Sequence, residues 1–254
     1  METVLIVILG GLLAGVITGL VGASAAVVIT PLFVTALGMD PYVAITIALA
    51  TDVIASGVSA VTYARDGYIR IKSAIPLVIT AAIGSVVGSY LATLIQADAL
   101  SSISVWITFL IGINFILSAD KEKKESANKA FFHKHEKVLK IVLGLVVGTL
   151  CGFIGAGGGM MILLILTAVL GYELKEAVGT SVFIMAFTAL TGALGHVAVL
   201  DSVPYGIILI SGIASIVGAY GASKFMGRTA LPTAKRVAGS ILIIIFLFSM
   251  AFGG

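Results

Sequence analysis

The segment Gly152-Phe-Ile-Gly-Ala-Gly-Gly-Gly-Met160 places a glycine-dense turn inside a long apolar region. An upstream segment, Gly19-Leu-Val-Gly-Ala-Ser-Ala-Ala-Val27, carries a related pattern about 133 positions earlier. The same offset aligns Gly11, Gly15, Gly19, Gly22 and Ala23 with Gly144, Gly148, Gly152, Gly155 and Ala156. An offset that holds over roughly 30 residues indicates an internal repeat. The sequence therefore predicts two versions of one unit, each with a turn at the same place.

The composition indicates that lipid surrounds most of the chain. Of 254 residues, 59% are hydrophobic and 11% are charged, and the mean hydropathy is +1.19. Soluble domains carry about 25% charged residues. The formal charge of +3 is expected to report membrane orientation rather than nucleic-acid binding. We therefore predict an integral membrane protein whose partners are the bilayer and a small substrate, with no nucleic acid.

Apolar runs bounded by charges or turn residues predict an all-α fold with five helical elements in each half. The runs are 3–22, 25–38, 41–64, 73–96 and 100–118, then 138–155, 158–171, 174–197, 204–226 and 233–252. A membrane span needs about 20 residues, so the second element of each half is too short. We predict about four spanning helices per half, plus a short or re-entrant helix after each glycine turn. The repeats are 1–118 and 138–254, joined by a cytoplasmic linker over 119–137.

Lysine and arginine gather in three regions, residues 65–72, 121–140 and 224–236. The positive-inside rule places all three at the cytoplasm. The connections around Asp98 and Asp201 contain no Lys or Arg and are expected outside. The third elements of the two halves then run in opposite directions. This predicts inverted-topology repeats in the cytoplasmic membrane, with both termini outside.

The chemistry of the turns favours binding of an anion. A glycine-rich turn that opens into a helix leaves backbone N–H groups free, and the helix dipole attracts negative charge there. The candidate residues are Gly155, Gly157, Gly158 and Gly159 in the second turn (residues 155–159), and Gly22, Ala23 and Ser24 in the first turn (residues 22–25). The alternative for small residues is close helix packing. We assign the upstream glycine columns (Gly11, Gly15 and Gly19; Gly144, Gly148 and Gly152) to packing and the second turn to binding.

Four polar side chains inside predicted helices are further candidates. The hydroxyls of Thr180 and Ser181 could donate to an oxyanion or bond to the backbone one turn back, and both readings stay open. Asp52 is the only carboxylate deep inside a predicted span, since Glu176 lies at the very start of its run. An acid in that setting is a functional hypothesis, here for proton coupling; a structural bond to Thr51 or Ser56 is the alternative. His196 is a weaker candidate for proton relay, with an interfacial histidine as the favoured reading.

At these residues the chain resembles the TauE/SafE family of sulfite exporters. Gly155-Ala-Gly-Gly-Gly159 and Gly179-Thr180-Ser181 match two motifs of that family, whereas the first half departs from them at Gly22-Ala-Ser-Ala-Ala26. The resemblance implies transport of sulfite, sulfonates or related sulfur-containing anions across the cytoplasmic membrane.

These observations predict a secondary transporter of a small anion, coupled to protons through Asp52. A passive small-anion channel would use the same turn chemistry and is the alternative. Metal-ligand spacing, a nucleotide-binding loop and a nucleophile triad are missing from the sequence, so we expect no enzyme activity, cofactor or metal. A homodimer is one assembly that the sequence allows.

Overall fold

The computed structural model describes residues 1–119, 136–155, 158–200, 202–226 and 231–252. All regular structure in these ranges is helical, as predicted. The helices are α1 (Glu2–Val21), α2 (Ala26–Leu37), α3 (Pro41–Arg65), α4 (Ile71–Ala92), α5 (Ala97–Leu117), α7 (Glu136–Ile154), α8 (Gly158–Leu164), the π-helical η1 (Ile165–Val169), α9 (Leu174–Val197), α10 (Tyr205–Met226) and α11 (Leu231–Phe252). Gly157 and most of the predicted linker lie outside the described residues.

Glycines end the first helix of each half. Gly22 after α1 and Gly155 after α7 adopt left-handed φ angles of 67° and 70°. The Gly22 N–H bonds to the Thr18 carbonyl at 3.0 Å, and the Gly155 N–H bonds to the Cys151 carbonyl at 2.7 Å. Glycine adopts this conformation without a steric penalty. Two equivalent positions of the internal repeat therefore stop their helices in the same way.

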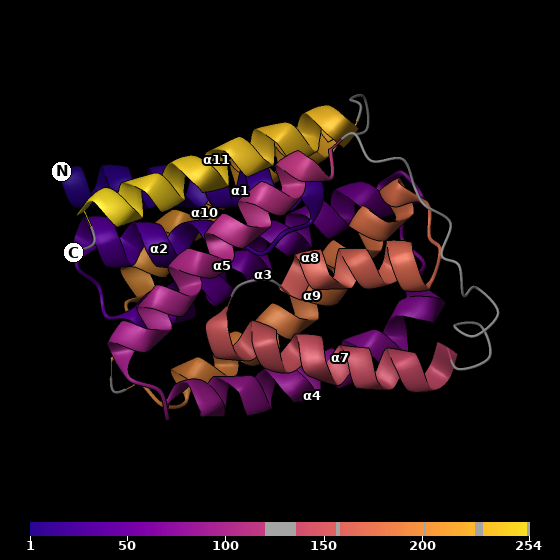
Figure 1. The fold of residues 1–254 in the computed structure, drawn as a ribbon, viewed down its shortest axis with the longest axis horizontal. Coiled ribbons are helices and arrows are strands. Elements are labelled where there is room, and N and C mark those ends of the chain that lie inside the picture. Colours follow the sequence, from indigo (N-terminus) through magenta and orange to yellow (C-terminus); the bar gives the residue numbers. More distant parts are fainter. Residues whose placement is uncertain (120–135, 156–157, 201, 227–230, 253–254) are drawn as a thin grey trace.

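The second element of each half is short, as predicted. Helix α2 has 12 residues, and α8 has seven before the chain continues as η1. In Figure 1, α2 returns from the middle of the molecule toward the end at which α1 begins. Residues Ala23, Ser24 and Ala25 have no exposed surface, so the first turn lies inside the helical bundle.

The glycine columns bring helices from different halves into contact. A Cβ at Gly15 of α1 would lie 2.2 Å from the Ser215 carbonyl oxygen of α10. A Cβ at Gly148 of α7 would lie 2.0 Å from the Ala81 carbonyl oxygen of α4. These approaches confirm the packing role predicted for the columns. The first helix of each half thus packs on the fourth helix of the other half, and Figure 1 shows α4 beside α7.

The central and peripheral helices differ in burial. In the most apolar 18-residue stretch of each helix, 67% is buried for α3 and α9. The corresponding share is 33–39% for α4, α5, α10 and α11. The outer helices expose large aliphatic side chains, including Ile79 and Ile83 of α4 and Ile213 of α10. Such a surface is suited to lipid. Helices α3 and α9 therefore form the centre of a multi-pass membrane protein.

Seven of the described helices are long and apolar enough to cross a membrane, namely α1, α3, α4, α5, α9, α10 and α11. The sequence predicted about eight spans. The apolar stretch of α7 in the described residues, Val138–Ile154, is shorter than the other candidate spans. Figure 1 places the start of α1 and the end of α11 at the same end of the molecule. The inverted relation of the repeats, their boundaries and the side on which the termini lie stay predictions.

Candidate functional site

The two glycine turns meet in the interior of the bundle. A Cβ at Gly159 would lie 2.1 Å from the Gly22 carbonyl oxygen and 3.2 Å from the Ala23 Cα. The Ser24 hydroxyl lies 2.8 Å from the carbonyl oxygen of Gly155, within hydrogen-bond distance. Gly22, Ala23, Ser24, Gly155, Gly158 and Gly159 are all buried. Candidate residues of both halves are thus brought together at one place.

Asp52 of α3 lies against the first turn and has no exposed surface. Its Oδ2 accepts a hydrogen bond from the Ser24 hydroxyl at 2.7 Å, and its Oδ1 accepts one from the Ala25 N–H at 3.1 Å. Ser56 donates to the backbone carbonyl of Asp52 rather than to its carboxylate. The ion pair found among the described residues, Arg70 with Glu176, does not involve Asp52. The protein's own carboxylate therefore occupies the position at the start of α2 that an external anion would take.

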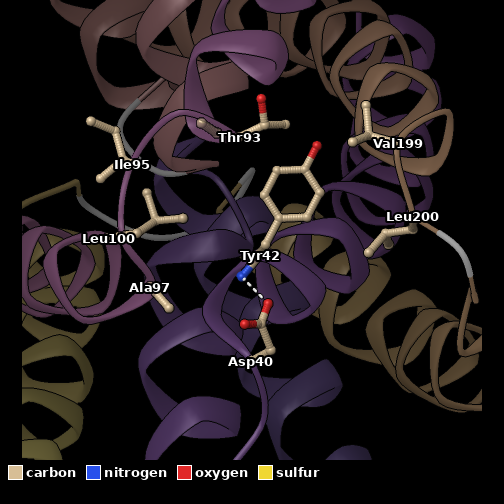
Figure 2. Close-up of a pocket in the computed structure, with 9 residues that line it drawn as sticks. Asp40, Tyr42, Thr93, Ile95, Ala97, Leu100, Val199 and Leu200 are labelled. Atoms are coloured by element: carbon tan, nitrogen blue, oxygen red, sulfur yellow. Dashed lines mark hydrogen bonds between the residues drawn. The ribbon is translucent and has the colours of Figure 1, made fainter.

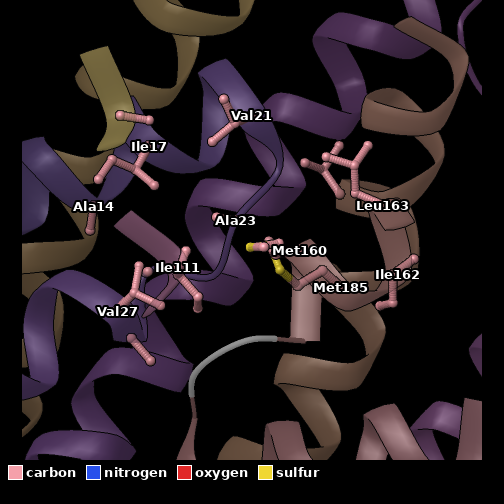
Figure 3. Close-up of a cluster of buried hydrophobic side chains, with 14 of the residues drawn as sticks. Ala14, Ile17, Val21, Ala23, Val27, Ile111, Met160, Ile162, Leu163 and Met185 are labelled. Atoms are coloured by element: carbon pink, nitrogen blue, oxygen red, sulfur yellow. The ribbon is translucent and has the colours of Figure 1, made fainter. Parts of the chain in front are cut away.

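The second turn has a different neighbour at the equivalent position. Met185 stands where the repeat offset would place a second acid, and its Sδ lies 2.5 Å from the position of a Cβ on Gly159. Figure 3 shows Met160 and Met185 together beside Ala23. A thioether is only a weak hydrogen-bond acceptor. Gly158 and Gly159, the first residues of α8, therefore face no carboxylate like that of Asp52 at this position.

The Gly-Thr-Ser segment of α9 contacts the protein backbone at each residue. The Tyr68 carbonyl oxygen would lie 2.7 Å from a Cβ on Gly179, and the Thr180 hydroxyl accepts a hydrogen bond from the Arg70 N–H at 3.2 Å. The Ser181 hydroxyl donates to the Val178 carbonyl at 2.9 Å. Ser181 also borders the first turn, because its Oγ lies 2.6 Å from the position of a Cβ on Gly22. Thr180 therefore anchors the α3–α4 connection, whereas Ser181 adjoins the site.

Arg70 fastens that connection to the start of α9. Its guanidinium lies 2.7 Å from the Glu176 carboxylate and 4.7 Å from the centre of the Tyr172 ring. The hydrogen bond to Glu176 raises the pKa of Arg70 above its ordinary value. Arg70 consequently stays charged at any physiological pH.

His196 lies one residue before the end of α9, and its interfacial position and its alternative role in proton relay both stay predictions. It has no exposed surface, its Nε2 lies 2.7 Å from the Gly152 carbonyl oxygen, and its ring stacks on Tyr42 at 4.3 Å. Tyr42 in turn borders a cavity of about 230 Å³ between the starts of α3 and α5 and the ends of α4 and α9. Figure 2 shows Tyr42 projecting into this space between Thr93 and Val199. Tyr42 and His196 therefore separate the cavity from the helix that leads into the second turn.

The seven candidate spans among the described helices, with buried glycines of the two turns in contact between them, define a polytopic membrane protein. The model of the sulfite exporter TauE/SafE family matches residues 7–249. The chain belongs to this family.

Individual relatives carry names of the same class. The chain is 28% identical over 218 residues to "Probable membrane transporter protein YunE" of Bacillus subtilis, covering 77% of this chain and 78% of that protein. It is 25% identical over 248 residues to "Probable membrane transporter protein YdhB" of the same organism, covering 96% and 100%. A Sinorhizobium protein, "Probable membrane transporter protein ORF9", is 24% identical over 237 residues, covering 92% and 85%. No solved structure matches the chain. The protein is a membrane transporter and not an enzyme.

Proposed function

We propose that the protein is a secondary transporter of a small anion, with sulfite or a sulfonate as first candidate, in the cytoplasmic membrane. The observation that carries this proposal is the contact between the two glycine turns in the buried middle of the bundle. Irregular backbone inside a membrane protein is tolerated where it is covered by protein or lines a substrate path. Transporters with repeated halves commonly bind substrate at such interrupted helices.

The second turn is the stronger candidate for contact with the anion. The first N–H groups of a helix have no partner within that helix. At α2 they are taken up by protein oxygens, because Asp52 accepts from Ala25 and the Ser24 Oγ accepts from Ala26. At α8 the equivalent acid is replaced by Met185. We therefore place the oxyanion at the N–H groups of Gly158 and Gly159, with Gly155 and Ser181 nearby.

Asp52 is the candidate for coupling transport to protons. A buried carboxylate whose partners are a hydroxyl and an amide is costly to hold as an ion, since its charge has no counter-ion among them. Proton uptake removes that cost. Protonation of Asp52 would also remove a negative charge beside the first turn. This change would alter the electrostatic potential that an anion meets at the second turn.

The test is uptake of labelled sulfite into proteoliposomes with and without an imposed pH gradient. We expect accumulation above equilibrium that disappears when the gradient is collapsed. The D52N variant should keep downhill flux but lose the response to the gradient, whereas D98N, which alters an exposed acid, should behave as wild type. Purely downhill flux in wild type would favour a channel, and an unchanged gradient response in D52N would remove Asp52 from the coupling.

A further inference from the structure

One hydroxyl lies between groups of the two halves. The Ser24 Oγ is 2.7 Å from the Asp52 Oδ2 and 2.8 Å from the Gly155 carbonyl oxygen. It also accepts a hydrogen bond from the Ala26 N–H at 3.3 Å. A serine hydroxyl has one hydrogen to donate and two lone pairs to accept with. Ser24 therefore cannot donate fully to both acceptors at once.

We propose that Ser24 transmits the protonation state of Asp52 to the second glycine turn. When Asp52 is ionised, the Ser24 hydrogen points to Oδ2, because a charged acceptor forms the stronger bond. When Asp52 takes up a proton on Oδ2, that proton is donated to the free lone pair of Ser24. The Ser24 hydrogen then turns to the Gly155 carbonyl. One proton enters, no covalent bond between heavy atoms changes, and the hydrogen bond moves from the first half of the chain to the second.

The position of Gly155 gives this exchange an effect on the substrate. Gly155 turns the chain with φ 70° between the end of α7 and the start of α8. A hydrogen bond from Ser24 to its carbonyl ties the end of α7 to the first turn, and Gly159 packs against the same turn at the Gly22 carbonyl oxygen. Protonation of Asp52 would thus strengthen the contact of Gly155 with the first turn, next to the anion position proposed at Gly158 and Gly159. The inference rests on the proposed function, and it assigns co-transport of a proton with the anion.

The other groups around Asp52 leave Ser24 as the link. Cys151 of α7 is the titratable side chain that faces the carboxylate, and it is fully buried. From α1, the neutral Thr18 hydroxyl lies beside it. On α9, His196 contacts α3 at Tyr42, about three turns from Asp52, and on α10 Ser211 bonds to the neighbouring Thr51. Cys151 meets Gly155 only through its backbone carbonyl, which accepts from the Gly155 N–H, and none of these side chains is hydrogen-bonded to both Asp52 and Gly155.

The first experiment needs no anion. Amide hydrogen exchange of the peptide covering 152–160 is measured at one alkaline pH in wild type, D52N, S24A and the double variant. The amide of D52N can donate to Ser24 as a protonated acid does. We therefore expect about five-fold slower exchange than in wild type, the scale of one hydrogen bond. In the S24A background the same replacement should have no effect. Equal protection by D52N with and without Ser24 would overturn the proposal.

The second experiment measures the affinity for methanesulfonate, whose own charge is constant across the neutral range, as a function of pH. Linkage to one proton allows wild-type affinity to rise by up to ten-fold for each unit that the pH falls. D52N should bind with no pH dependence, S24A with a much weaker dependence than wild type, and S24T with the wild-type dependence. The matched control is S59A, which also removes a buried hydroxyl, in this case one on α3. If the affinity of S24A depended on pH as steeply as that of wild type, the role of Ser24 would be refuted.

Failure of the wild type to bind methanesulfonate would instead count against the proposed substrate class. The exchange experiment would still decide the role of Ser24.

Discussion

At the scale of single residues, Gly159 has no room for a side chain. A Cβ there would meet the Gly22 carbonyl oxygen at 2.1 Å and the Met185 Sδ at 2.5 Å. The first of these atoms belongs to backbone and cannot turn aside. The contact between the turns is therefore possible only with glycine at this position.

We expect G159A to separate the turns and to weaken binding of the anion. Overpacking of this kind costs about 1–3 kcal/mol, which should appear as a lower midpoint of thermal unfolding together with loss of sulfite uptake. Gly221 of α10 has open space around its Cβ position, so G221A serves as the control. If G159A transported sulfite at the wild-type rate, the contact between the turns would not be needed for function.

The sequence identified the turn glycines and the buried acid but missed how they are joined. Asp52 was found because it is the only carboxylate deep inside a predicted span. Its partner Ser24 lies 28 positions away in the chain, and Gly155 lies 131 positions from Ser24. No periodic pattern links such positions, because the contact depends on how the two halves pack. A polar residue within an otherwise apolar turn was the only signal that pointed to Ser24.

At the scale of elements, the glycine columns determine which helices pair. The spacing of Gly144, Gly148 and Gly152 predicted close packing, and the structure confirms it against α4. The partner helix itself was not predicted. A small-residue column specifies a close approach, but it does not say which of several apolar helices approaches.

Replacement of Gly148 by leucine should disrupt the α4–α7 pair. Its Cβ position is 2.0 Å from the Ala81 carbonyl oxygen, so the helices would have to move apart. We expect a loss of about 3 kcal/mol or more in stability, measured by unfolding in detergent. G221L, on an exposed position of α10, provides a matched change of the same size in lipid. Similar unfolding of the two variants would show that the approach at Gly148 contributes little.

At the scale of the whole molecule, lysines and arginines mark one end. Lys140 of α7 bonds to Ser73 of α4 at 2.7 Å, and Lys235 of α11 bonds to the Ser118 carbonyl at 3.1 Å. The first bond joins the start of α7 to the start of α4. The second joins the start of α11 to the residue that follows α5. The approximate bounds of the described helices were predictable from hydropathy, whereas the short apolar stretch of α7 and the π-helical η1 were not. The arrangement of the helices around α3 and α9 was not predictable either, because all of the outer helices are similarly apolar.

Labelling with a membrane-impermeant maleimide in intact cells tests the orientation of this end. A cysteine introduced as D98C should react from outside, whereas K72C should react only after the membrane is opened, because the positive-inside rule places it at the cytoplasm. The native Cys151 is fully buried and should contribute little background in the parent protein. The reverse pattern of labelling would invert the predicted topology and place both termini inside.

The exchange of partners between the halves bears on how the protein is made. Helix α1 leaves the ribosome long before α10, which begins at Tyr205, yet the glycine face of α1 packs against α10. Helix α4 likewise waits for α7. The earliest segments must therefore reside in the bilayer with their close-packing surfaces unmatched until most of the polypeptide has been synthesised. Assembly is thus a late, concerted event, in which neither half reaches its mature form before the other has entered the membrane.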